Sequence, residues 1–253
     1  MFKRILAFAY GLGSYAAFLG AFLYAIGFIG NLWVPKSIDS APQGSFLAAL
    51  AINLGLLGLF AVQHSGMARP AFKRWWTRII PKPVERSTFV LATSLCLAAL
   101  FAFWQPMGGV VWNVENEVAR AAVYGLFFLG WGIVFIATCL INHFDLFGLR
   151  QVWLHVKGKE YKPLLFTEPF LYRWVRHPLY VGFILAFWAA PTMTIAHLFF
   201  AVVTTLYILV AIQLEERDLV AEHGERYEQY RRRVPMLIPR LRGSQRPTVA
   251  GAA

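Results

Sequence analysis

The residues best suited to chemistry lie in the segment 171–182, which reads LYRWVRHPLYVG. Arg176, His177, Pro178 and Tyr180 stand directly ahead of an apolar run, where polar chemistry would meet the edge of a membrane. Pro178 suits the first turn of a helix, because the N–H that proline lacks is not needed there. The free N–H groups of such a turn favour an anion, so a ligand carboxylate or phosphate can lie beside Arg176 and His177. The alternative is a basic membrane anchor capped by an interfacial tyrosine.

Other polar residues end separate apolar segments and are candidate partners of that motif. Ionisable side chains at a membrane edge cost enough free energy to be functional candidates by default. Because four apolar segments end in such side chains, we expect them to share one face of the membrane. The set comprises Gln63 and His64; His143, Asp145, Arg150 and Gln151; Tyr172; and Glu215 with Glu216.

The elements that must position these residues are membrane-spanning helices. The chain has 253 residues, of which 58% are hydrophobic and only 15% charged. A soluble domain of this length rarely has that balance, so the composition predicts an all-α, polytopic integral membrane helix bundle. A transmembrane helix needs about 20 apolar residues. Such runs predict five to six transmembrane segments, at residues 5–29, 46–62, 88–104, 121–142, 178–190 and 192–213.

The last two segments are predicted to form a helical hairpin, because the first is too short to cross about 30 Å of hydrocarbon upright. A highly charged tail at 215–233 is expected to be helical, and the segment 63–87 is expected to be a basic loop. The chain therefore divides into N-terminal transmembrane helices at 1–142, a core with hairpin and tail at 143–240, and a disordered end at 241–253.

The distribution of positive charge predicts the orientation. If the spans alternate in direction, 22 of the 24 Lys and Arg residues fall on one side, leaving Lys36 and Arg120 on the other. Cytoplasmic loops carry such an excess, so we expect both termini and the candidate residues on the cytoplasmic side. This rule accounts for the net charge of +11 without a nucleic-acid partner, for which the chain carries no motif.

Several familiar classes of site are missing from the sequence. There is no glycine-rich dinucleotide motif, P-loop, HExxH or GxSxG pattern. His143, Asp145 and His155 match no metal-site template, so we expect no metal ion. Cys96 and Cys139 fall inside predicted spans and are expected to be small buried apolar residues, not a disulfide.

The order of the remaining motifs is specific. Tyr172 is followed by RHPLYVG, an apolar hairpin, the pair Glu215 and Glu216, and then HGERY at 223–227. Over residues 142–239 this pattern resembles the superfamily of isoprenylcysteine carboxyl methyltransferases and phospholipid methyltransferases. The stretches LYAIGFIGNLWVPKSIDS, AVQHSGMARP and INHFDLFGLRQVWL extend the resemblance along the chain to the bacterial methanethiol S-methyltransferases.

The resemblance implies an enzyme that uses S-adenosylmethionine as methyl donor, held by the core at 143–240 instead of a Rossmann domain. Donor-binding positions of the superfamily match Tyr172, His177, Pro178, Tyr180, and one or both of Glu215 and Glu216. The donor's carboxylate suits Arg176 or His177, and Arg150 with its neighbour Gln151 offers another clamp. The sequence departs from the pattern at 167–170, TEPF, where relatives often have a glycine-containing turn.

The implied acceptor is a small thiol, methanethiol or hydrogen sulfide, and the implied location is a bacterial inner membrane, in contact with lipid. A simple thiol must lose its proton, as a cysteine with a pKa of about 8.5 does. The catalytic candidates for this step are His64, His143 and Asp145. His143 and Asp145 share no face of a continuous helix, so a break after Asn142 is needed to bring them together. Two of the three candidates have a structural alternative. His64 can cap its span, and Asp145 can pair with Arg150 or be a helix N-cap.

Three other functions stay open on the sequence alone. The same donor can serve a lipid or a prenylcysteine carboxylate as acceptor. A non-catalytic membrane binding protein of the same fold, or a nicotinamide-dependent membrane reductase, is also compatible with the residues.

Overall fold

The computed structural model describes residues 1–42 and 44–240 and confirms the predicted all-α membrane bundle. Five helices are long and apolar enough to cross a membrane: α1 (Phe2–Gly30), α2 (Phe46–Ala68), α4 (Lys82–Phe103), α5 (Glu117–Ile141) and α9 (Ile195–His223). A further apolar helix, α8 (Pro178–Trp188), has only 11 residues. The predicted disordered end at 241–253 lies outside the described residues.

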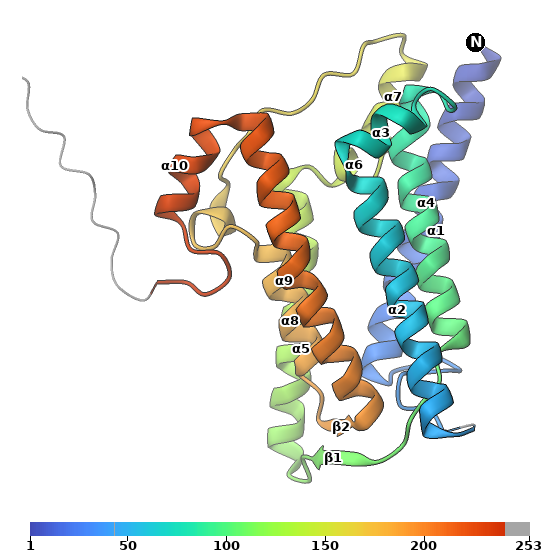
Figure 1. Cartoon of the computed structure of the whole chain (residues 1–253), viewed down its shortest axis with the longest axis vertical. Helices are drawn as coiled ribbons and strands as arrows, with labels where there is room; N and C mark the ends of the chain where they lie inside the picture. The colour runs from blue at the N-terminus through green and yellow to red at the C-terminus, as the bar shows by residue number, and fades with distance from the viewer. Residues whose placement is uncertain (43, 241–253) are drawn as a thin grey trace, which may run out of the picture.

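Short helices occupy the connections at the end of the bundle that holds the N-terminus (Figure 1). They are α3 (Pro70–Trp76), α6 (His143–Leu146), α7 (Leu149–Val156) and α10 (Glu225–Arg233), and a 3-10 turn, η1 (Phe170–Arg173), precedes α8. At the opposite end, β1 (Val110–Asn113) and β2 (Thr192–Thr194) form a two-stranded antiparallel pair, which we did not predict. The predicted polar face and its basic segments thus lie at one end of the molecule.

The segment 63–87, predicted as a loop, is largely helical. α2 continues to Ala68, so Gln63 and His64 lie within a helix, and α4 already begins at Lys82. The difference has a physical reason. Hydropathy measures the length that hydrocarbon embeds, whereas a helix can continue into the headgroup region, where Lys and Arg side chains remain solvated.

The C-terminal hairpin and the helical tail are present as predicted. α8 and α9 are joined through β2, and α9 runs without interruption from Ile195 past the end of the predicted span to His223. Gly224 ends it with a φ of 57°, a left-handed conformation that glycine adopts without strain. α10 follows directly, so Glu215 and Glu216 lie on a continuous helix that leaves the apolar core.

Close packing against α5 fixes the position of α8. A Cβ atom added at Gly130 of α5 would lie only 2.7 Å from the carbonyl oxygen of Gly182 on α8. The missing side chains therefore let the two backbones touch, and α8 is held on α5 with its N-terminus at the polar end. Cys96 is partly buried and Cys139 on α5 is exposed, so the prediction that both are buried was wrong for Cys139.

Candidate active site

The sequence motif meets a carboxylate of α9 at the N-terminus of α8. Nε2 of His177, the residue before α8, lies 3.0 Å from Oε1 of Glu216. Arg176 Nε donates to the same oxygen over 2.7 Å. The side chains are buried: that of Glu216 is 7% exposed and that of His177 is 5% exposed. The hairpin therefore joins the adjacent Arg176 and His177 to Glu216, which lies 40 residues after Arg176, in one internal network.

Arg176 makes three hydrogen bonds in this network through Nε and Nη1. Besides Glu216, its guanidinium donates through Nη1 to the carbonyl oxygens of Arg231 at 3.1 Å and Val234 at 2.5 Å. The backbone N–H groups of the two motif residues donate to the carbonyls of Pro235 and Met236. The segment after α10 thus closes over the motif, and Nη2 is the only guanidinium nitrogen of Arg176 without a hydrogen bond to a described residue.

Glu215 lies beside Glu216 in a more open environment. The hydroxyl of Tyr180 donates to its Oε2 over 3.0 Å, and Nδ1 of His177 lies 3.9 Å from the same atom. The Glu215 side chain is 42% exposed, and its Oε1 makes no hydrogen bond within residues 1–42 and 44–240. Of the two glutamates, Glu216 therefore serves the protein's own motif, and Glu215 retains capacity for a ligand.

Tyr172 connects this network to α5 and α10. Its hydroxyl donates to the carbonyl of Ala137 over 3.4 Å, and the hydroxyl of Tyr230 donates to its backbone carbonyl over 2.6 Å. Burial raises the pKa of Tyr172, and the Glu215 carboxylate raises it further, so the phenol stays neutral at physiological pH. Two residues earlier, Phe170 has a φ of 30°, a left-handed conformation that glycine would adopt without strain.

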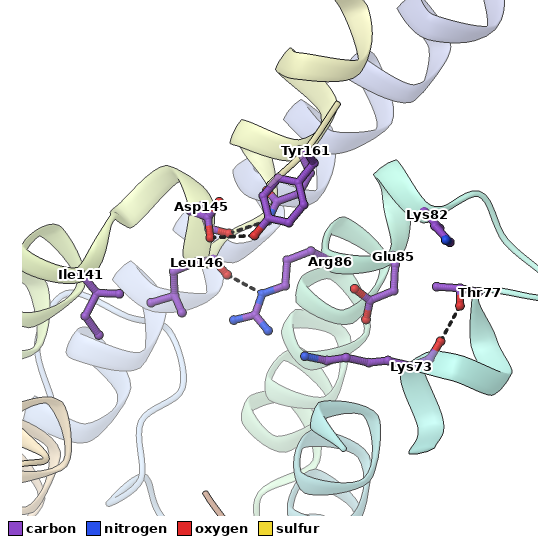
Figure 2. A pocket seen from close by; sticks show the side chains of 10 residues that line it. Lys73, Thr77, Lys82, Glu85, Arg86, Ile141, Asp145, Leu146 and Tyr161 are labelled. Carbon is purple, nitrogen blue, oxygen red and sulfur yellow. Dashed lines mark hydrogen bonds between the residues drawn. The ribbon is translucent and has the colours of Figure 1, made fainter. Parts of the chain in front are cut away.

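Asp145, Arg150 and Gln151 form a second group, on α6 and α7. Arg150 Nη1 donates to Asp145 Oδ1 over 2.7 Å, and Gln151 Nε2 donates to the Asp145 carbonyl over 3.1 Å. The structural alternative for Asp145, pairing with Arg150, is thus present. Asp145 and Gln151 also line a cavity of about 370 Å³ between these helices and the α3–α4 region (Figure 2). No hydrogen bond or ion pair between described residues joins this group to the His177–Glu216 network.

His143 faces away from Asp145. α5 does break at Asn142, whose φ is 148°, but the break turns the His143 ring toward α1 and α5. The hydroxyl proton of Thr138 is donated to the Phe135 carbonyl, so Thr138 Oγ1 can only accept from His143 Nδ1, which lies 2.8 Å away. The other ring nitrogen of His143, Nε2, then accepts from the Tyr15 hydroxyl at 2.9 Å. Burial lowers the pKa of His143, in keeping with this neutral tautomer. The predicted approach of His143 and Asp145 is therefore absent.

His64 lies within α2, so its role as a cap at the end of the span is excluded. Its Nδ1 is 3.3 Å from Thr93 Oγ1, and its ring stacks on that of Phe60 with centroids 5.2 Å apart. Neighbouring residues tie α2 to α9: Ser65 and Tyr207 share a hydrogen bond of 3.0 Å. His64 therefore packs between α2 and α4, and no hydrogen bond between described residues joins it to Asp145 or His177.

Two residues that we did not single out contact these groups. Tyr15 on α1 binds His143, and Arg86 on α4 lines the cavity beside Asp145. An arginine next to an apolar run was the only available indication for Arg86. Tyr15 lies inside an apolar span, and nothing in its spacing indicated a partner on α6.

Comparison with known proteins places this arrangement in a family. Residues 131–221 match the isoprenylcysteine carboxyl methyltransferase (ICMT) family. The chain is 61% identical to the methanethiol S-methyltransferase of Crocosphaera subtropica, over 94% of this chain and 93% of that protein. It is 53% identical to the enzyme of the same name from Mycobacterium tuberculosis, over 94% and 97%.

A more distant relative is Nurim of Rattus norvegicus, 35% identical over 69% of this chain and 70% of Nurim. No solved structure is significantly similar to the chain. The five membrane-spanning helices, the match to a family of carboxyl methyltransferases and the near full-length identity to several relatives agree with one another. This chain belongs to the methanethiol S-methyltransferase family of integral membrane proteins.

Proposed function

We propose that the protein transfers the methyl group of S-adenosylmethionine to methanethiol, forming dimethyl sulfide and S-adenosylhomocysteine. The observation that carries this proposal is the 61% identity to a methanethiol S-methyltransferase over 93% of that relative's length. Hydrogen sulfide is a smaller thiol of the same chemistry and is proposed as a second acceptor. We also propose that the site opens to the cytoplasmic side of a bacterial inner membrane, which agrees with the positive charge at that end.

The residues of the motif fit such a donor. The exposed Glu215 carboxylate has an oxygen without a partner among the described residues, which suits an ammonium group or ribose hydroxyls. Tyr172 and Tyr180 offer aromatic rings for an adenine, and Pro178 begins a helix whose first N–H groups favour a carboxylate. We propose that Glu216, His177 and Arg176 form the buried base of this site. Arg150 and Gln151 would extend it toward α7.

The donor would supply a methyl group activated on a sulfonium sulfur. In the in-line displacement, a new carbon–sulfur bond forms to the acceptor thiolate, and the electron pair of the broken bond stays on the donor sulfur. Because this step neutralises both charges, a site shielded from water lowers its barrier relative to bulk water. The chain's part is to orient both sulfur atoms, exclude water and remove the thiol proton.

His64, His143 and Asp145 are the proposed proton acceptors, and their surroundings differ. Asp145 lines the cavity but is paired with Arg150. The Nε2 lone pair of His143 is occupied by the Tyr15 hydroxyl, so His143 acts as a base only if Tyr15 passes on or releases its proton. His64 is bound to a neutral hydroxyl on α4 and has no carboxylate partner among the described residues.

We also propose that residues 1–142 form the membrane-embedded support and that residues 143–240 hold the donor. Lipid contacts the apolar helices, and no role for lipid as a substrate is proposed.

The test is methyl transfer from labelled S-adenosylmethionine to methanethiol by the purified protein in detergent, beside a prenylcysteine acceptor. Labelled dimethyl sulfide from the native chain and its loss in His177→Ala are expected. His155→Ala is the matched control, because His155 on α7 lies outside the proposed site and should leave transfer unchanged. Transfer to the prenylated acceptor alone would refute the thiol assignment. Failure to bind the donor would support the non-catalytic alternative.

A further inference from the structure

The cavity between α3–α4 and α6–α7 collects more charge than the proposed reaction uses. Its volume is about 370 Å³. Figure 2 shows that its lining side chains converge from several elements of the chain. The charged and polar lining groups are Lys73 of α3, Thr77, Lys82, Glu85 and Arg86 of α4, Asp145 of α6, Gln151 of α7, and Tyr161; of the three cations, Lys82 is exposed.

Arg86 lines the cavity with an open guanidinium fork. Its Nε donates to the Leu146 carbonyl over 2.6 Å, and its guanidinium carbon lies 4.8 Å from the centre of the Phe89 ring. Neither Nη1 nor Nη2 makes a hydrogen bond or an ion pair within residues 1–42 and 44–240. In contrast, Arg150 is paired with Asp145, and Arg176 with Glu216.

Lys73 brings a second positive charge to the same space. Burial lowers the pKa of Lys73, and repulsion from Arg86 lowers it further, against a smaller opposing effect of Glu85. The Lys73 side chain has no hydrogen bond to a described residue and extends toward the Arg86 side of the cavity (Figure 2). Two cations with free donors therefore converge where a single anion would relieve their repulsion.

Gln151 adds an independent observation. Its side chain is only 9% exposed, and Nε2 is held by the Asp145 carbonyl over 3.1 Å. Its Oε1 is buried and has no hydrogen-bond partner among the described residues, and the residue itself lines the cavity. A buried acceptor without a partner is destabilising, so this oxygen is expected to receive a donor from a ligand.

We infer that this cavity binds the oxyanion of a zwitterionic ligand, with Arg86 and Lys73 on the oxyanion and Gln151 Oε1 facing the ligand's ammonium group. Two sources carry this chemistry. One is the amino-acid end of the methyl donor and its product; this source rests on the function proposed above, with the donor's carboxylate here in place of the N-terminus of α8 and with Glu215 left to the ribose hydroxyls. The other is a phosphate–ammonium lipid headgroup, which would reach the cavity from the membrane surface. Asp145, whose carbonyl holds Gln151 Nε2, adds negative charge beside the ammonium position, whereas Glu85 lies beside Lys73 and Arg86.

The experiment measures equilibrium binding of two probes to the full chain in detergent: S-adenosylhomocysteine and glycerophosphoethanolamine, the water-soluble form of the headgroup. Lys73→Gln is the main variant, because that side chain makes no hydrogen bond or ion pair with a described residue. Arg86→Gln is the second, and its bond to the Leu146 carbonyl makes a check of folding necessary. Arg74→Gln is the matched control, since Arg74 is exposed on the same helix outside the cavity.

Loss of one charge-assisted contact is expected to lower the affinity for the probe that occupies the cavity by about tenfold or more in both cavity variants. The affinity of Arg74→Gln should be unchanged. The probe that loses affinity identifies the source. If the native chain binds glycerophosphoethanolamine in a Lys73-dependent way but not S-adenosylhomocysteine, the inference stands and the proposed function fails. If S-adenosylhomocysteine binds equally to all variants and the headgroup does not bind, the inference is overturned and the proposed function survives. Binding of neither probe overturns the inference.

Discussion

The two ends of α9 each carry a histidine–carboxylate pair, and the surroundings of the pairs differ. At the strand end, His197 of α9 lies 3.4 Å from Asp39, and its Nε2 donates to the Phe187 carbonyl over 3.0 Å. Asp39 also accepts from Thr194 and from Asn31, so its carboxylate is bound on both oxygens. At the polar end, Glu216 binds His177, but the adjacent glutamate keeps an unbound oxygen and is 42% exposed.

The same residue types have different roles at the two ends of α9. The Asp39–His197 pair is closed by the protein's own donors and joins the α1–α2 loop to the start of α9. The His177–Glu216 pair is equally buried, yet it stands beside groups with unused hydrogen-bonding capacity. A histidine beside a carboxylate is therefore no sufficient indication of a site, and the presence of unsatisfied neighbouring groups is what distinguishes the two ends.

Glu216→Ala is expected to have the largest effect. It leaves the Arg176 and His177 side chains buried without their carboxylate, and removing one partner of a buried pair costs about 3–5 kcal/mol. Thermal unfolding in detergent should show a large drop in stability, accompanied by loss of methyl transfer. A variant with native stability would contradict the internal role assigned to Glu216.

His197→Ala breaks the pair at the other end. It leaves the Phe187 carbonyl and one contact of Asp39 without a donor, at an expected cost of about 1–3 kcal/mol. Donor affinity and turnover of the protein that remains folded should match the native chain, in contrast to Glu216→Ala. Thermal unfolding and donor binding, measured on the same preparation, check this. Loss of donor affinity at native stability would erase the distinction between the two ends.

Glu215→Gln sharpens the difference between the adjacent glutamates. The neutral amide keeps the shape and can still accept from Tyr180, so stability should change little. Loss of the charge should weaken the hydrogen bonds that this side chain accepts from the donor's ribose hydroxyls and lower the affinity by about tenfold. Equilibrium binding of S-adenosylhomocysteine measures this, with Glu222→Gln, also on α9 but outside the proposed site, as control. Equal affinity in both variants would remove Glu215 from the proposed site.

The smallest expected effect is a pH dependence at the strand end. Burial by itself would raise the pKa of Asp39, but hydrogen bonds from His197 and Thr194 outweigh it and hold the pKa below its ordinary value. A depressed pKa contributes stability that is present above the unfolded value of about 3.9 and is lost as the pH falls through the folded value. Asp39→Asn should therefore lower the melting temperature at pH 7 and flatten its decline toward pH 3. A decline as steep as that of the native chain would show that other carboxylates dominate.

Much of the architecture followed from composition and patterning. Long apolar runs with few charges predicted the spans, and the excess of Lys and Arg between them predicted which segments share an end. Span boundaries at the polar end were wrong by six residues at 63–68 and 82–87 and by ten at the end of α9, because hydropathy does not register a helix that continues into the headgroup region. The strand pair β1–β2 was missed, because pairing between segments so far apart in the chain depends on the bundle that brings them together.

For the candidate site, the sequence alone determined which residue types were available: the RHP motif, its tyrosines and the two glutamates form a pattern at fixed spacing. Only the tertiary structure decided how these residues divide their roles. It showed Arg176 committed to Glu216 and to carbonyls, Arg86 left open, and His143 turned away from Asp145. The physical reason is that hydrogen-bonding capacity is a property of three-dimensional surroundings: side chains of the same type are used up or left free by partners that lie far away in the chain.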